Sequence, residues 1–196
     1  MDQTQATSHP FHALLSGTYK LFERLVLERI QDDVDSQLPV EQGGFRRNRG
    51  CNEQLLAFST FVESGFHNHQ KTSIAQLDLT TAYGTVWKDG MVLKFAKIIT
   101  CLKLARLITN MLSNRMFRVY LEDNSSKWKR LNSGLVQGSV LSPTLFNVYT
   151  AGMPKTVCKK FVHPDDLTLA YQSKDLCEAE VQLQHDIKVM NRYYSK

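Results

Sequence analysis

The sequence lacks the marks of several protein classes. No apolar run approaches the roughly 20 residues that a membrane-spanning helix requires, so we expect no membrane partner. The first ten residues, MDQTQATSHP, have no basic start followed by an apolar core, and we expect no signal peptide. No internal repeat or low-complexity tract is present. These absences favour an ordinary globular chain.

Cysteine is scarce and scattered. The four cysteines are Cys51, Cys101, Cys158 and Cys177. None forms a Cys-x-x-Cys pair, and no histidine lies at zinc-finger spacing from them. The HNH segment at 67–69 places two histidines two residues apart, which do not share a helix face, so we interpret it as surface. We therefore expect reduced thiols in an intracellular protein.

Length and charge narrow the possibilities further. A chain of 196 residues, 42% hydrophobic and 22% charged, suits one large domain or a domain with a small lobe. The formal net charge of +5 indicates a mild preference for a polyanionic partner. Nothing in the sequence indicates an oligomer.

Helical periodicity recurs along the chain. We expect helices over residues 18–34, 54–66, 88–112 (one helix, or two broken near Thr100), 140–153 and from 175 onward. The expected apolar stripes are Phe22, Val26, Ile30 and Val34; Leu55, Phe58, Val62 and Phe66; and Leu176, Ala179, Leu183, Ile187, Met190 and Tyr194. Thr18 and Asn52 are the expected caps of the first two helices, and Asp175 and Glu178 have capping-box spacing in the last.

Strand patterns lie between these helices. Residues 73–79 alternate, with Ala75, Leu77 and Leu79 on one face. Residues 159–163 and 167–171 predict two short strands, and residues 116–122 and 127–131 flank DNSS as a hairpin. The whole pattern predicts an α+β fold with helices packed on one face of a small antiparallel sheet, and a possible lobe division near residue 72.

Three aspartates stand at the ends of these strands. Asp78 ends the first, while Asp165 and Asp166 lie in the expected turn between the two short strands. If these elements share one sheet, three carboxylates converge, and such a cluster is unfavourable unless a cation neutralises it. A pair of Mg²⁺ ions there would support phosphoryl or nucleotidyl transfer. The alternative is an ordinary Asp-Asp turn, because Asp readily bonds its own backbone.

The surrounding segments resemble the reverse transcriptase domains of non-LTR (LINE-type) retrotransposons. Five blocks occur in the family's order: YKLFERLVLERI, EQGGFRRNRGCNEQ, LDLTTAYGTVW, LSNRMFRVYLEDNSSKWKRLNSGLVQGSVLSPTLFNVYT and PDDLTLAY. The resemblance implies a polymerase palm with partial helical fingers and no thumb. It further implies a disordered N-terminus over 1–10, fingers over 11–72 and a palm over 73–196, within one domain over 11–196.

The resemblance also assigns roles to single residues. Asp78, Asp165 and Asp166 match the catalytic metal ligands, holding two Mg²⁺ ions with Mn²⁺ as a possible substitute. The implied nucleotide- and template-binding residues are Tyr83, Gln137, Gly138, Arg46 and Arg49. Tyr83 matches the aromatic residue under the sugar; a core tyrosine is the alternative. The RRNR segment, taken alone, is as consistent with a solvated loop as with phosphate contact.

The same analogy names the reaction and its partners. It implies an RNA-directed DNA polymerase acting on an RNA template, a DNA primer and deoxynucleoside triphosphates, in the cytoplasm or the nucleus. Holding such polyanions without reading their sequence relies on Lys and Arg contacts to phosphate.

Departures from the family pattern limit the expected activity. His163 and Pro164 stand where the family has Tyr-Ala, and Gly84 stands where it usually has Asp. Val136 replaces a usual proline. Pro164 removes a backbone N–H beside the acidic pair. We expect a truncated, diverged polymerase fragment with weak or no activity; the alternative is a catalytically dead basic module that binds nucleic acid or protein.

Overall fold

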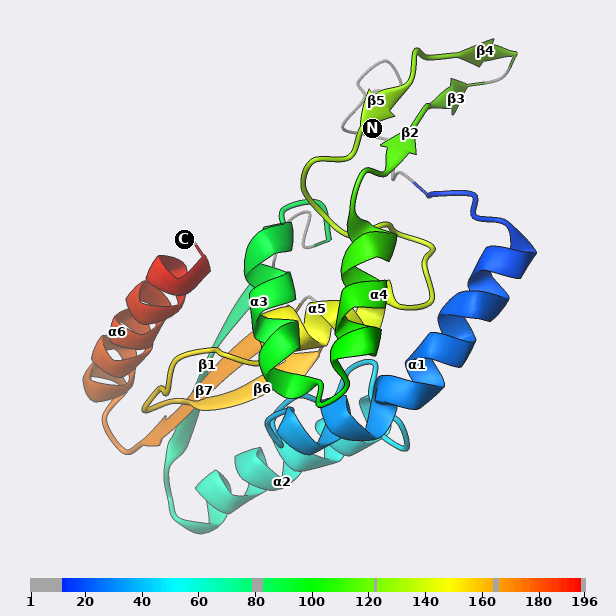
Figure 1. Ribbon diagram of the computed structural model, residues 1–196. Helices are drawn as coiled ribbons and strands as arrows, with labels where there is room; N and C mark the ends of the chain where they lie inside the picture. Colours follow the sequence, from blue (N-terminus) through cyan, green and yellow to red (C-terminus); the bar gives the residue numbers. More distant parts are fainter. Residues whose placement is uncertain (1–11, 79–82, 122, 164–165, 195–196) are drawn as a thin grey trace. The chain divides into compact units, whose positions relative to one another are not determined.

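The computed structural model describes residues 12–78, 83–121, 123–163 and 166–194 (Figure 1). These form two compact units, each assembled from two separated stretches of chain. One unit comprises Met1–Ser36 with Tyr83–Tyr149, and the other Gln37–Ala82 with Thr150–Lys196. The N-terminus expected to be disordered lies outside the described residues.

The second unit is built on a three-stranded antiparallel sheet. Its strands are β1 (Lys71–Asp78), β7 (Asp166–Ser173) and β6 (Lys159–His163), in the order β1-β7-β6. The strand at β1 and the two strands around the acidic pair are thus confirmed. Leu79 lies outside the described residues, and Asp166, expected in the turn, belongs to β7. The central strand lies in the core, since Leu167 and Leu169 are fully buried.

Two helices cover the sheet. Helix α6 (Leu176–Tyr194) packs Leu183 and Met190 onto the Leu167 and Leu169 face of β7. Helix α2 (Cys51–His67) packs on the other face. There Phe58 and Phe61 hold the Phe161 ring of β6, with ring centroids 5.2 and 5.9 Å apart. The α+β class is confirmed, with helices on both faces of the sheet rather than on one.

The predicted stripe of α2 is wrong at its ends. Leu55 is 64% exposed and Phe66 is 71% exposed, while Phe58 and Phe61 point to the sheet. Its N-cap residue is Gly50, which forms no side-chain cap, so the Asn52 cap is wrong too. At α6, Asp175 Oδ1 does accept the Cys177 N–H at 2.9 Å.

The reciprocal half of the α6 capping box is replaced by other bonds. The Asp175 N–H donates to Ser173 Oγ at 3.0 Å. The Glu178 carboxylate accepts from Ser173 Oγ and from the Tyr171 hydroxyl instead. The start of α6 is therefore tied to the end of β7.

The first unit is largely helical. It contains α1 (Gly17–Gln37), α3 (Lys88–Ile98), α4 (Leu102–Leu112) and α5 (Ser142–Thr150). The break near Thr100 is confirmed, because α3 and α4 are separate helices. The buried stripe of α1 is Glu23, Val26, Ile30 and Val34, so Glu23 replaces the expected Phe22. Ser16 Oγ accepts the Tyr19 N–H at 3.2 Å, and the expected Thr18 cap is therefore wrong.

An exposed hairpin connects α4 to α5. Strand β2 (Met116–Phe117) pairs with β5 (Lys129–Arg130), and β3 (Tyr120–Leu121) pairs with β4 (Asn124–Ser125). The hairpin is confirmed, but Asn124 and Ser125, expected in the turn, belong to a strand. We call residues 115–131 the basic ribbon (Figure 1).

No helix among the described residues is long and apolar enough to cross a membrane. The division into fingers over 11–72 and palm over 73–196 stays a prediction.

Candidate active site

Two of the three aspartates meet at one end of the sheet. Asp78, the last residue of β1, is the register partner of Asp166, the first residue of β7. Residues directly opposite in an antiparallel pair project to the same face with Cβ atoms about 4.5–5.5 Å apart. Asp78 is exposed and Asp166 half-buried, so both carboxylates remain open to water. Like charges in this arrangement repel, and a cation between them would relieve the repulsion.

His163 extends the same row. It is the register partner of Asp166 on the other side of β7, which places Asp78, Asp166 and His163 side by side across three strands. The His163 ring turns toward α2, where its Nε2 lies 3.0 Å from Cys51 Sγ. The imidazole is thus anchored to the first residue of α2.

The connection between β6 and β7 consists of Pro164 and Asp165, which lie outside the described residues. Across the described part of the chain, no group of three or more His, Cys, Asp and Glu side chains is placed to hold a metal. The oxygen donors of Asp78 and Asp166 suit a hard divalent cation, which prefers carboxylate ligands.

Tyr83 packs in the other unit, against the core of that unit. Its ring stacks on Phe146 of α5, with centroids 5.1 Å apart and planes 28° from parallel. Its carbonyl accepts the Leu135 N–H at 2.7 Å, and the Val86 carbonyl accepts the Gly134 N–H at 2.9 Å. The main chain after β1 is therefore bonded to the loop before α5.

That loop contains the two other predicted residues, Gln137 and Gly138. Gln137 is exposed, and its carbonyl accepts the Ala13 N–H at 2.9 Å. Gly138 has φ +107°, and a Cβ there would lie 2.7 Å from the Ala13 carbonyl oxygen. Only glycine fits this close approach without strain.

A residue that sequence reasoning missed fixes the same loop. Glu23 of α1 is 1% exposed; its Oε1 accepts from Ser139 Oγ at 2.5 Å and its Oε2 from the Val140 N–H at 2.8 Å. The signal was present in the sequence, because Glu23 lies on the stripe with Val26 and Ile30 at helical spacing. A carboxylate on a buried stripe indicates a specific donor.

Arg46 and Arg49 lie in the loop between α1 and α2. Arg46 Nη1 donates to the Pro39 carbonyl at 2.9 Å, and Arg49 Nη1 donates to the Val40 carbonyl at 2.9 Å. Both guanidinium groups therefore brace their own loop.

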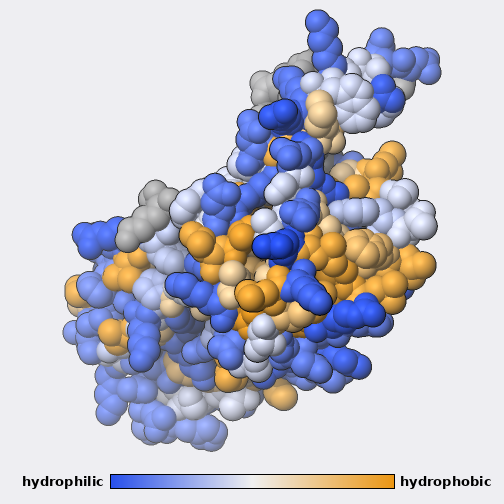
Figure 2. Space-filling model, viewed as in Figure 1, coloured by the Kyte–Doolittle hydropathy of each residue, from blue (hydrophilic) through white to orange (hydrophobic). Residues whose placement is uncertain are grey.

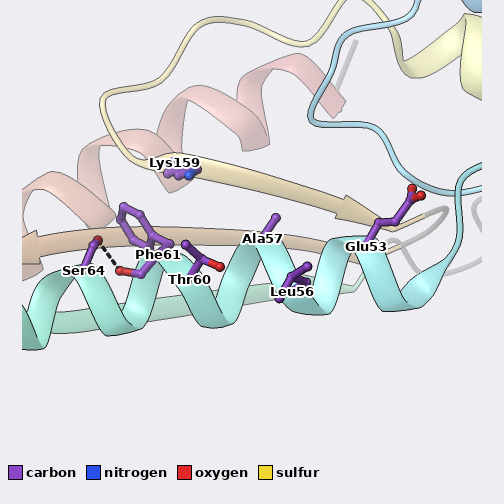
Figure 3. Close-up of a pocket in the computed structure, with 7 residues that line it drawn as sticks. All are labelled: Glu53, Leu56, Ala57, Thr60, Phe61, Ser64 and Lys159. Carbon is purple, nitrogen blue, oxygen red and sulfur yellow. Dashed lines mark hydrogen bonds between the residues drawn. The ribbon is translucent and has the colours of Figure 1, made fainter.

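A shallow depression lies between α2 and β6 (Figure 3). Its lining is Glu53, Leu56, Ala57, Thr60, Phe61, Ser64 and Lys159. None of the predicted catalytic or nucleotide-binding residues lines it, so it is not part of the candidate site.

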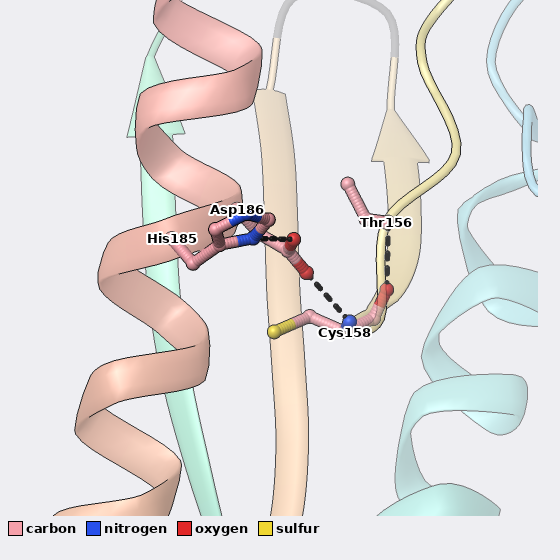
Figure 4. Close-up of polar contacts among 4 residues, drawn as sticks. All are labelled: Thr156, Cys158, His185 and Asp186. Carbon is pink, nitrogen blue, oxygen red and sulfur yellow. Dashed lines mark hydrogen bonds and ion pairs between the residues drawn. The ribbon is translucent and has the colours of Figure 1, made fainter.

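A buried carboxylate lies near the start of β6 (Figure 4). Asp186 of α6 is 1% exposed; its Oδ2 accepts the Cys158 N–H at 2.7 Å, and its Oδ1 lies 3.1 Å from His185 Nδ1. Burial raises the pKa of Asp186, but the hydrogen bonds from Cys158 and His185 outweigh it and hold the pKa below the ordinary value. Burial and Asp186 raise the pKa of the Cys158 thiol to about 12. Asp186 thus ties α6 to the residue before β6, and none of the predicted site residues takes part in this cluster.

The comparison with protein families shows which family the chain belongs to. The family described as reverse transcriptase (RNA-dependent DNA polymerase) matches residues 3–196. The chain belongs to this family. The predicted resemblance to non-LTR retrotransposon reverse transcriptases is confirmed.

Curated relatives of this reverse transcriptase chain come from fruit flies. It is 32% identical over 174 residues to an RNA-directed DNA polymerase from mobile element jockey of Drosophila melanogaster, covering 88% of this chain and 19% of the relative. It is 30% identical to the probable RNA-directed DNA polymerase from transposon BS of the same species, covering 88% of this chain and 20% of the relative. The chain thus spans about a fifth of these relatives.

The fold has a solved counterpart in a telomerase. The chain matches apo telomerase from Candida tropicalis, truncated from its C-terminal domain, with a TM-score of 0.52 at 13% identity. The match covers 87% of this chain and 36% of that structure, and it supports the fold alone.

Proposed function

We propose that this chain is the catalytic portion of an RNA-directed DNA polymerase in which Asp78, Asp165 and Asp166 hold the catalytic metals. The observation that carries the proposal is the pairing of Asp78 with Asp166 at one end of the sheet. Asp165 directly precedes Asp166 in the sequence. Two Mg²⁺ ions, or Mn²⁺ in their place, would supply activation of the primer hydroxyl and stabilisation of the leaving phosphate. The substrates would be an RNA template, a DNA primer and deoxynucleoside triphosphates.

The chain's own residues would provide binding and position. Asp78 and Asp166 present carboxylate oxygens on one face, while Tyr83, Gln137 and Gly138 would line the nucleotide pocket. Arg46 and Arg49 would contact phosphate. Such catalysis depends mostly on positioning and electrostatics, so small displacements matter.

The test is primer extension with the purified chain on an RNA template annealed to a DNA primer. We expect slow extension with Mg²⁺ or Mn²⁺, and none after Asp78→Asn or Asp165→Asn. Asp89→Asn, which removes a carboxylate from the exposed start of α3, is the matched control and keeps the parental rate. Extension that survives Asp78→Asn would refute the proposed metal site.

Metal binding provides a readout without turnover. An ion that binds only the folded chain raises its melting temperature. We expect Mg²⁺ to raise the melting temperature of the parent and of Asp89→Asn, and to leave that of Asp78→Asn unchanged.

The second candidate is a binding module that has lost catalysis. It is favoured by the substitution of His163-Pro164 for Tyr-Ala and by the anchoring of the His163 ring to Cys51. Nucleic-acid binding with a cooperative melt, but with no extension in either metal, would select it.

A further inference from the structure

The basic ribbon is unusual because it has no core of its own. Every described residue from 116 to 130 is exposed, including Tyr120 and Trp128 at 58% each. A two-stranded hairpin without a packed face is marginally stable alone. Aromatic side chains on it therefore bury little against the protein and are available to a ligand.

Its base is nevertheless firmly attached. The Leu131 N–H donates to the Arg115 carbonyl at 2.9 Å, and Lys88 of α3 donates to the Leu131 carbonyl. The Arg115 guanidinium lies over the Tyr19 ring of α1, 5.2 Å from its centroid. Contacts with α1 and α3 thus hold the base of the ribbon, while its strands are exposed (Figure 1).

The charge on the ribbon is mostly positive. Between residues 115 and 131 there are five cationic residues, Arg115, Arg118, Lys127, Lys129 and Arg130, against two acidic ones, Glu122 and Asp123. This short stretch carries a large part of the chain's net charge of +5. The space-filling view shows a mostly hydrophilic surface where β3 and β4 lie (Figure 2). Such a surface suits a polyanion.

The aromatic rings are interleaved with these cations. The Arg118 guanidinium lies 4.5 Å from the Tyr120 ring centroid and 5.0 Å from the Trp128 centroid, joining the two strands of the ribbon. The Ser126 N–H donates to the Val119 carbonyl at 2.8 Å beside them. Arg118 therefore fixes two exposed rings on one short segment.

We propose that the basic ribbon binds single-stranded nucleic acid, with Trp128 and Tyr120 as base-stacking platforms and Lys127, Lys129 and Arg130 as phosphate contacts. Exposed aromatic rings among cations are the features by which proteins hold single strands without reading their sequence. A protein partner would favour a less charged centre. The ribbon adds a binding site to those of the proposed polymerase function, and this binding requires neither metal nor chemistry.

The chain offers a direct probe. It has two tryptophans, Trp87 and Trp128, so Trp87→Phe leaves Trp128 as the sole tryptophan. We expect a 20-nucleotide poly(A) RNA, in EDTA, to quench Trp128 fluorescence, whereas heparin, which has charge but no bases, leaves it unquenched. Equal quenching by both ligands, or none by RNA that binds, overturns the stacking role.

Matched variants locate the binding. In the wild-type background, Trp128→Leu should weaken RNA affinity about tenfold. Lys127→Ala with Lys129→Ala should lower the slope of log affinity against log salt concentration by about 1.4. Lys188→Ala with Arg192→Ala, which removes two exposed cations from α6, is the control and changes neither. Equal losses in both double variants would show diffuse electrostatic binding and overturn the site.

The result is separable from catalysis. Binding is measured in EDTA, and circular dichroism of each variant reports whether it folds. Ribbon-dependent binding without extension leaves this site standing and refutes only the polymerase proposal. If the chain extends primers but no ribbon variant changes its RNA affinity, the polymerase proposal stands and the ribbon site is refuted.

Discussion

Pro164 is the residue whose replacement tests the proposed catalytic role of the acidic pair most directly. It precedes Asp165 and has no backbone N–H. We expect Pro164→Ala to raise the primer-extension rate at least about tenfold, since a displacement near 1 Å costs on the order of 10²-fold. Pro154→Ala, in the loop before β6, is the matched control and leaves the rate unchanged. An unchanged rate in Pro164→Ala would show that the turn tolerates proline.

Asp186 gives a prediction about stability and pH. Its pKa is lowered in the fold, so its contribution is present above the ordinary carboxyl value of 3.8 and is lost as the pH falls below it. Asp186→Asn should lower the free energy of unfolding by about 1.5 kcal/mol at pH 7, because a buried charged acceptor is lost.

Urea denaturation at several pH values tests this prediction. The difference between wild type and Asp186→Asn should shrink as the pH falls from 7 toward 3. Glu180→Gln, an exposed carboxylate on the same helix, should stay within about 0.5 kcal/mol of wild type at pH 7. A difference that is constant with pH would mean that Asp186 acts by packing alone.

At the scale of elements, Glu23 joins α1 to the loop before α5. Glu23→Ala would leave the Val140 N–H and the Ser139 hydroxyl buried without their acceptor, which costs about 2 kcal/mol of unfolding free energy. Glu28→Ala, on the exposed side of α1, should cost less than about 0.5 kcal/mol. Equal costs in urea denaturation would contradict the anchoring role.

The elements also show what sequence could and could not predict. The strands β6 and β7 were predictable because their apolar runs are short and bounded by the acidic pair. The face of α2 was not, because Leu55, Phe58, Phe61 and Phe66 surround that helix with apolar side chains. Which pair turns inward depends on the position of Phe161, more than ninety residues away in the sequence.

The candidate site, too, could be predicted only in part from the sequence. The sequence placed Asp78 at a strand end and Asp166 in the adjoining turn, and their proximity followed from the expected sheet; the structure places Asp166 in β7 itself. The contact of His163 with Cys51 could not be predicted, because it joins a departure from the family pattern to a helix start distant in sequence. Periodicity assigns residues to faces, but it does not say which distant element meets each face.

At the scale of the whole molecule, the two units alternate along the sequence, because each is built from two separated stretches of chain. Strand β1 comes from the first half of the chain, and its partner β7 comes from near the end. We expect a chain ended at Thr150 to lose the order of residues 71–78, because no partner strand remains. Hydrogen exchange should show protected amides in this segment of the full chain and fast exchange in the shortened one. Protection in both would mean that α2 alone holds β1.

The backbone bonds between residues 83–86 and 134–135 determine which substitutions this part of the chain tolerates. Gly134, at φ +83°, has no room for a side chain, since a Cβ would lie 2.8 Å from the Gly84 carbonyl oxygen. Yet the bonds made by Tyr83, Val86 and Leu135 use only main-chain atoms, so they are indifferent to most substitutions. Gly84, which stands where the family usually has Asp, contributes no side chain to them. Substitutions that change the side-chain chemistry of this segment should therefore leave its main-chain connection in place.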